Sequence, residues 1–163
     1  MTKKPRGPHH PPERPGLAWA GLAMRILVGG VLALSGAGKA GAPPEEFAAA
    51  IEAYALVPPA LILPIAVLVP WAEVVAGFAL LAGWLTRWTA AAAAGLFGVF
   101  ITALSSTMVR GIELADCGCF GFGFRLAPSQ TVFLDIFLAG AACWLFLHAE
   151  TALSLDAWAK EGS

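Results

Sequence analysis

Charge is scarce in this sequence: only 13% of its 163 residues are charged, whereas 58% are hydrophobic. A soluble domain of this size needs far more polar surface to cover itself. Strand-like alternation of polar and apolar residues is absent too, and Ala, Leu and Gly dominate the apolar runs. Because helices satisfy their own backbone hydrogen bonds in lipid, these absences predict an all-α integral membrane protein. We expect the lipid bilayer as its surroundings, and no nucleic acid as a partner.

Histidine and cysteine are also few, with three of each, and there is no Cys-X-X-Cys pair. Cys117 and Cys119 lie one residue apart, but two thiolates make only half of a four-coordinate zinc or iron–sulfur site. His9 and His10 lie in the N-terminal tail and His148 lies near the end of the last apolar run, all distant from the cysteines along the chain. We therefore expect no metal site and no haem held by paired histidines.

Four apolar runs each reach the ~20 residues needed to cross a hydrocarbon core of ~30 Å. They are Leu17 to Gly38, Ala60 to Gly83, Trp88 to Val109 and Ser129 to Ala149. These runs predict a four-helix membrane bundle formed by residues 17–150. Residues 1–16, with five prolines and a cluster of Lys and Arg, read as a disordered basic tail, and residues 151–163 form a second tail.

The basic tail and the first run also resemble a secretory signal, but the run is too long for a signal and carries Arg25, so we expect an uncleaved first span. With this tail in the cytoplasm, six Lys or Arg residues outside the spans face the cytoplasm and three face outward. The positive-inside rule then predicts a multi-pass protein of the cell (inner) membrane with both termini cytoplasmic. The segment that contains Cys117 and Cys119 would be extracytoplasmic, where a thiol pair can persist as a disulfide.

Residues 43–54, between the first two spans, predict a short amphipathic helix. A Pro-Pro-Glu-Glu entry favours a helix start, and Phe47, Ile51 and Tyr54 fall on one face at helical spacing. This face either docks a partner or covers the bundle, and the sequence leaves both open. In the second span, Pro70 is expected to kink the helix one turn before Glu73.

Charges within spans are costly and are candidate functional residues. At ~1.5 Å per residue, Arg25 and Glu73 lie about 12 Å and 15 Å from the cytoplasmic edges of their spans, so we predict that they pair. The pair would act as a structural clasp or, alternatively, orient a quinone or a proton path. Asp135 lies about 9 Å below the outer surface, and we predict a contact with Lys39 at the outer end of the first span.

The pair formed by Cys117 and Cys119 is the strongest chemical signal. Thiols one residue apart close only a small, strained ring, and strained disulfides are the labile ones, which suits exchange. Gly118, between them, gives the backbone freedom to adopt unusual angles. The alternative is a thiol pair or disulfide that only shapes the loop. Cys143, deep in the last span, reads as a small buried hydrophobic residue.

The order of several residues along the chain is typical of one family. These residues are Arg25, Gly29-Gly30, Ser35-Gly36 and Lys39, then Phe47, Tyr54, Pro58, Pro70-Trp71-Ala72-Glu73, Gly77, Arg110-Gly111, Cys117-Gly118-Cys119-Phe120-Gly121 and Asp135. The set resembles the MauE family, the methylamine utilisation membrane proteins within the DoxX-like group. This resemblance implies a four-span protein that supports maturation of the disulfide-rich small subunit of methylamine dehydrogenase, alongside a thioredoxin-like extracytoplasmic partner.

Together, the residues and the resemblance favour a membrane thiol–disulfide relay in which Cys117 and Cys119 act as a thiol–disulfide oxidoreductase on an extracytoplasmic, disulfide-rich client. A quinone is a candidate electron acceptor, because the layout is also similar to that of quinone-linked disulfide-forming enzymes. Two alternatives stay open: a non-catalytic scaffold or chaperone that docks a client through residues 43–54, and a DoxX-like quinone-oxidase subunit or small-solute carrier built around Arg25 and Glu73.

Overall fold

The computed structural model describes residues 15–112, 127–148, 153–156 and 158. Cys117, Cys119 and most of the two predicted tails lie outside the described residues. The regular elements are α1 (Pro15–Gly41), α2 (Pro44–Tyr54), α3 (Pro59–Ala82), α4 (Thr86–Val109) and α5 (Pro128–Leu147). Four of them, α1, α3, α4 and α5, are long and apolar enough to cross a membrane. The predicted all-α fold with four spans is confirmed.

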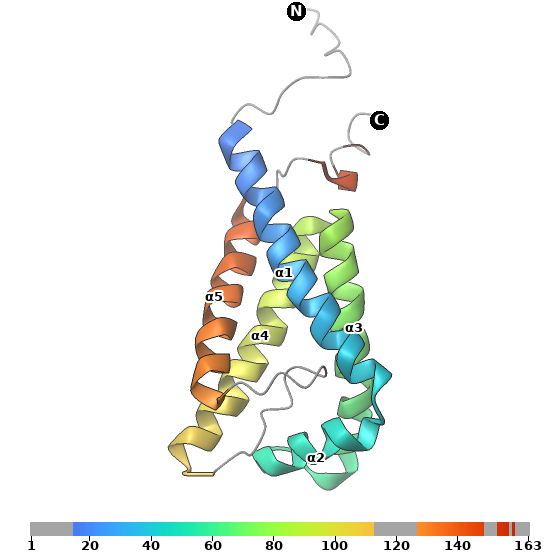
Figure 1. The fold of residues 1–163 in the computed structure, drawn as a ribbon, viewed down its shortest axis with the longest axis vertical. Coiled ribbons are helices and arrows are strands. Elements are labelled where there is room, and N and C mark those ends of the chain that lie inside the picture. The colour runs from blue at the N-terminus through green and yellow to red at the C-terminus, as the bar shows by residue number, and fades with distance from the viewer. Residues whose placement is uncertain (1–14, 113–126, 149–152, 157, 159–163) are drawn as a thin grey trace, which may run out of the picture.

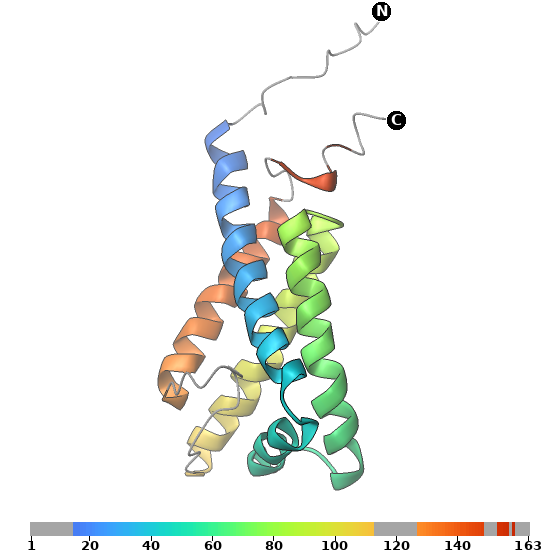
Figure 2. The same ribbon diagram turned by 45° about the vertical axis from the view of Figure 1, so that its right-hand side comes forward.

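The helices form a bundle in which α1 lies against α3 and α4 lies against α5, as Figures 1 and 2 show. We call the end of the bundle where α1 begins and α5 ends the terminal end, and the opposite end the α2 end. The short helix α2 lies across the α2 end (Figure 1). At the terminal end, α1 reaches beyond the last turn of α3, which affects how their charges align.

Small residues let α1 and α3 approach closely. A Cβ added to Gly77 would lie 2.5 Å from the Ala33 nitrogen, and one added to Gly36 would lie 2.7 Å from the Pro70 carbonyl oxygen. The neighbouring contact pairs Gly29 with the carbonyl of Gly77. Such contacts stabilise helix association in lipid, where van der Waals packing between close backbones, and not the hydrophobic effect, holds helices together. They fix the antiparallel register of α1 on α3.

The bundle core is apolar and shared by four helices. Val28 and Leu32 of α1, Leu80 of α3, Ala90 and Phe97 of α4, and Leu138, Ala142 and Leu145 of α5 belong to one buried cluster. Large apolar side chains are also exposed along the outer faces of the spans, among them Leu34, Leu68, Val99 and Phe133. In a membrane these outer faces contact lipid, so the protein is apolar both inside and outside.

Prolines lie both at the starts of helices and inside one of them. Pro44 and Pro59 stand at the starts of α2 and α3, where the missing N–H costs nothing. Pro64 and Pro70 lie inside α3. Pro70 removes a backbone hydrogen bond one turn before Glu73, the only carboxylate residue in the α3 sequence.

Candidate functional site

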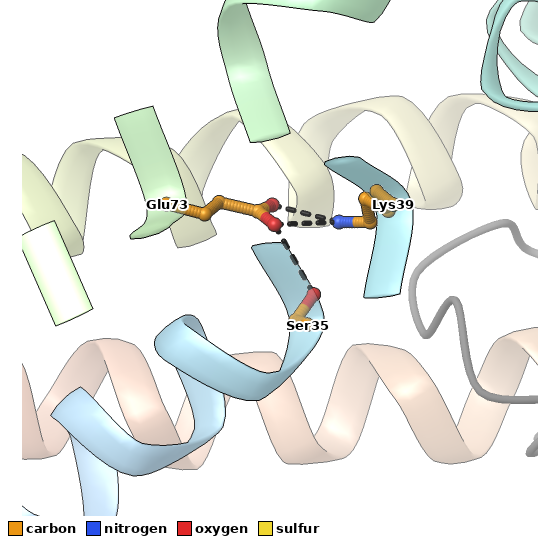
Figure 3. A network of polar contacts seen from close by, with 3 residues as sticks. All are labelled: Ser35, Lys39 and Glu73. Atoms are coloured by element: carbon orange, nitrogen blue, oxygen red, sulfur yellow. Dashed lines mark hydrogen bonds and ion pairs between the residues drawn. The ribbon is translucent and has the colours of Figure 1, made fainter. Parts of the chain in front are cut away.

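A buried ion pair joins α1 to α3 near the α2 end (Figure 3). The Lys39 ammonium donates to both oxygens of the Glu73 carboxylate, at 2.7 Å to Oε1 and 2.9 Å to Oε2. The Ser35 hydroxyl, one turn before Lys39, donates to Oε2 of Glu73 at 3.2 Å. The side chains of Lys39 and Glu73 are only 3% and 1% exposed. The arrangement carries two charges inside the bundle with their hydrogen bonds made.

Two aromatic rings cover the ammonium. The Lys39 nitrogen lies 5.1 Å from the ring centroid of Phe47 on α2 and 4.6 Å from that of Phe100 on α4. Ring faces attract a cation, and more strongly where water is excluded. Lys39 therefore links four elements: its own helix, α3 through Glu73, and α2 and α4 through the two rings.

The predicted pairing of Arg25 with Glu73 is wrong. The Arg25 guanidinium lies at the last turn of α3, where its Nε donates to the Leu80 carbonyl at 2.9 Å. Leu80 is about 10 Å along the helix from Glu73, because each residue rises ~1.5 Å. The depth estimate assumed that the two spans begin level, but α1 extends beyond α3 at the terminal end (Figure 1).

The predicted contact of Lys39 with Asp135 is also wrong, because the Lys39 ammonium is bonded to Glu73. Asp135 is buried on α5, in the half of that helix nearest the α2 end. The α1–α3 register decides the choice of carboxylate: the close contact of Gly36 with Glu73 places this carboxylate beside Ser35 and Lys39.

One signal in the sequence would have favoured the observed pairing. Arg25, Val28, Leu32, Ser35 and Lys39 recur at alternating spacings of three and four and form a buried stripe along α1. Arg25 and Lys39 therefore share one face of α1 at opposite ends, about 21 Å apart along its axis. A single carboxylate on a facing antiparallel helix can pair with only one of these two cations. Which one it pairs with depends on the register of the two helices, so the small-residue pattern that sets this register was needed to identify Lys39.

The three side chains proposed for docking a partner are buried within the chain itself. Phe47 and Ile51 pack with Ala66 of α3, and Tyr54 packs with Leu104 of α4. Since these side chains are covered by the bundle, the structure favours the covering role of α2. The face of α2 that remains exposed carries Glu45, Glu46 and Glu52.

Cys117 and Cys119 lie outside the described residues, but both residues that flank their segment are described. Ile112 follows α4 and Ala127 precedes α5, and both helices have these ends at the α2 end (Figure 1). Arg110 connects this region to α2: its guanidinium donates to the backbone carbonyls of Tyr54 and Ala55. The ends of α2 and α4 are therefore held together beside the start of the cysteine segment.

Metal ligands do not gather in the part of the chain that the structure describes: no group of three His, Cys, Asp or Glu residues there could hold an ion. Cys143, predicted to be buried in the last span, is instead an exposed free thiol on α5. In a membrane this exposure is to lipid, so Cys143 keeps the character of a small apolar residue.

Comparison with known proteins gives one family and one relative. The family model described as methylamine utilisation protein MauE matches residues 17–148. A methylamine utilization protein MauE from Methylophilus methylotrophus is 39% identical over 75 residues, which cover 46% of this chain and 40% of that relative. The match thus spans less than half the length of the relative. No solved structure matches.

Proposed function

Because the chain belongs to the MauE family of methylamine utilisation proteins, we propose that it is a membrane thiol–disulfide relay that supports disulfide formation in an extracytoplasmic protein. The observation that carries the proposal is the placement of the Cys117-Gly118-Cys119 sequence between the ends of α4 and α5. Two neighbouring thiols there are attached to a bundle whose α2 end is held together by Lys39, Glu73 and Arg110.

The proposed step is a two-electron exchange. One thiolate of the client attacks the Cys117–Cys119 disulfide and forms a mixed disulfide, and the second client thiolate then releases the relay. The client loses two electrons and two protons and gains a disulfide, while Cys117 and Cys119 become two thiols. A disulfide of a thioredoxin-like partner then takes the two electrons and two protons and restores the relay disulfide.

The ion pair of Lys39 and Glu73 is a poor site for a quinone. Lys39 and Glu73 are bonded to each other, and the rings of Phe47 and Phe100 cover the ammonium. A quinone carbonyl would have to displace these contacts to reach the Lys39 ammonium. We therefore write the relay with a protein disulfide as the oxidant and take no step through a quinone.

The family and relative names suggest the pathway. Both are named for methylamine utilisation, and the family resemblance points to the disulfide-rich small subunit of methylamine dehydrogenase as client. We propose a client of this class, with several disulfides and an extracytoplasmic location, and a thioredoxin-like protein as the exchange partner. The α2 end would then face outward, with both chain termini in the cytoplasm.

Single serine variants test the relay directly. Cys117→Ser and Cys119→Ser each leave one thiol that cannot resolve a mixed disulfide, so we expect either or both to trap a partner covalently. The measurement is non-reducing electrophoresis of whole cells, with mass spectrometry of any adduct that is lost on reduction. Cys143→Ser is the matched control, because it removes a thiol that lies within a span and is expected to leave trapping unchanged.

The double variant Cys117→Ser/Cys119→Ser separates the relay from a scaffold. A relay loses client maturation completely in this variant, whereas a scaffold keeps it. Full maturation in the double variant would rule out the relay and favour the scaffold. The burial of Phe47, Ile51 and Tyr54 means that a scaffold would have to use other residues for docking.

A further inference from the structure

The described residues that follow α5 lie at the terminal end and contact the turn between α3 and α4. The Asp156 carboxylate accepts from the backbone N–H of Leu85 at 2.8 Å and from that of Thr86 at 2.7 Å. The Asp156 N–H donates to the Gly83 carbonyl at 3.1 Å. We call residues 153–156 the strap. It connects the chain after α5 to the start of α4 and the end of α3.

Arg25 of α1 meets the strap from the other side. Its Nη2 donates to the Leu81 carbonyl at 2.9 Å and to the Leu153 carbonyl of the strap at 3.3 Å. Gly83 is in close contact with both the strap and Arg25: a Cβ added to Gly83 would lie 2.6 Å from the Ser154 Cβ and 2.7 Å from the Arg25 Cζ. The strap and Arg25 are thus packed around one turn, and all four spans contribute to the cluster or lead into it.

The unpaired backbone groups at helix ends explain why Arg25 and Asp156 are favourable at this turn. The last carbonyls of α3 and the first N–H groups of α4 have no partner within their own helices. A cation is favourable at the first site and an anion at the second, and Arg25 and Asp156 supply them. The two side chains also carry opposite charges and interact electrostatically. The buried guanidinium of Arg25 therefore has its nearby negative charge on the strap.

The strap is held mainly by these polar contacts. Leu153 and Leu155 are 77% and 49% exposed, so a large part of their apolar surface stays outside the contact. Leu153 also has a φ of 50°, in the left-handed region that side-chain-bearing residues rarely adopt. The hydrogen bonds and the charge interaction described above are thus opposed by an unfavourable backbone conformation, which suits a contact that opens and closes.

We propose that residues 153–156 are a releasable strap that ties the terminal ends of the four spans together. When the strap is docked, Arg25 and Asp156 close the α3–α4 turn. When it is released, Leu85 and Thr86 lose the acceptors of their N–H groups, and Arg25 loses both its bond to Leu153 and the neighbouring carboxylate. The device is independent of the thiol chemistry at the opposite end.

Amide hydrogen exchange in full-length protein, reconstituted in lipid nanodiscs, tests the strap. Asp156→Ala removes the acceptor of two amides, so we expect exchange at Leu85 and Thr86 to accelerate about five- to tenfold. Glu52→Ala is the matched control, because it removes an exposed carboxylate on α2 at the other end. The control should leave both amides within about twofold of the wild type.

A second variant releases the strap without changing charge. Leu153→Ile replaces one aliphatic side chain by an isomer of the same size at an exposed position. A β-branched residue is, however, disfavoured at the φ of 50° that residue 153 adopts. We expect about fivefold faster exchange at Leu85 and Thr86, on the scale of the cost of the left-handed conformation. Leu155→Ile, at an exposed strap position in a helical turn, is its control and should have little effect.

Two results would overturn the proposal. Exchange at Leu85 and Thr86 that stays at the wild-type rate in both Asp156→Ala and Leu153→Ile would show that the strap does not protect these amides. Equal loss of protection in α2, around Phe47 and Ile51, would show that the strap is a fixed part of the fold whose loss unfolds the bundle. Acceleration confined to the α3–α4 turn supports a releasable strap.

Discussion

At the scale of single residues, the ion pair of Lys39 and Glu73 joins α1 to α3 inside the bundle. Both groups are removed from water, and each would be an uncompensated charge without the other. The attraction between the two charges offsets the free-energy cost of burying them, so the intact pair adds little net stability. Removal of one partner, in contrast, strongly lowers the free energy of unfolding. This asymmetry is directly measurable.

We expect Glu73→Gln to lower the free energy of unfolding by about 3–5 kcal/mol, because Lys39 is left buried without its counter-charge. Lys39→Met in the same chain should recover much of this loss, since no charge then remains at the site. The measurement is reversible unfolding in mixed micelles, analysed as a double-mutant cycle. Glu52→Gln, which changes an exposed carboxylate, is the control and should change stability by at most about 0.5 kcal/mol.

A second double-mutant cycle tests whether Glu73 pairs with Lys39 or with Arg25. Arg25→Gln and Glu73→Gln should be additive to within about 0.5 kcal/mol, because the two side chains lie at different levels of α3. A large coupling between Arg25 and Glu73, together with additivity between Lys39 and Glu73, would contradict the observed pairing and restore the one expected from span depths.

The charges of the spans can be recognised in the sequence, whereas their partners were assigned wrongly, for a physical reason. Burial of Arg25, Glu73 and Asp135 follows from hydropathy alone, because a charge within a span turns away from lipid. Burial of Lys39 does not, because this residue was expected at the outer end of the first span. Pairing depends on the axial offset between helices, which span edges do not define. That offset is set by backbone contacts at glycines, whose partners on the other helix are not visible in the sequence.

At the scale of elements, the contact between α1 and α3 sets the register. Gly29, Ala33 and Gly36 on α1 face Gly77 and the Pro70 turn on α3, with spaces too small for an added Cβ. The four-residue spacing of Gly29 and Ala33 is a packing signal that can be read from the sequence. It did not identify Gly77 as their partner, because any small residue on three other spans was eligible.

Gly77→Ala should be strongly destabilising, by about 1–3 kcal/mol or more, because its Cβ would lie 2.5 Å from backbone nitrogen of Ala33. Gly95→Ala in α4 is the matched control. No atom lies within 4 Å of an added Cβ there, so the substitution should be neutral or stabilising by up to about 1 kcal/mol. Thermal unfolding of both variants in the same detergent measures the difference. Equal stability of the two variants would contradict the close α1–α3 contact.

The apolar face of α2 was predicted correctly, and its partner is the bundle. Ile51→Ala should therefore destabilise the protein by about 2–5 kcal/mol, as for other buried aliphatic side chains. A docking face would instead leave stability unchanged and weaken partner binding. Unfolding of the purified protein, in which no partner is present, separates the two, and Glu52→Ala on the exposed face of α2 is the control. An unchanged unfolding midpoint in Ile51→Ala would contradict the packing role.

At the scale of the whole molecule, the two ends of the bundle have different chemistry. The α2 end holds the buried ion pair of Lys39 and Glu73 and the start of the cysteine segment, whereas the terminal end holds Arg25 and the strap. Hydropathy predicted the number of spans and their limits to within about three residues, because the ~20-residue requirement of the bilayer is strict. The strap was missed, since its polar residues follow the last span and no periodic pattern marks them.

The predicted orientation places the α2 end outside the cell membrane and the strap in the cytoplasm, as the Lys and Arg distribution favours. Single cysteines at Glu52 and at Leu155, both exposed in the structure, report the two ends in a background without native cysteines. In intact spheroplasts, a membrane-impermeant maleimide should label the cysteine at position 52, whereas the one at 155 should react only after permeabilisation. The reverse pattern would place the Cys117-Gly118-Cys119 segment in the reducing cytoplasm, where a stable disulfide is rare. The extracytoplasmic relay would then be excluded, while the fold and the strap would be unaffected.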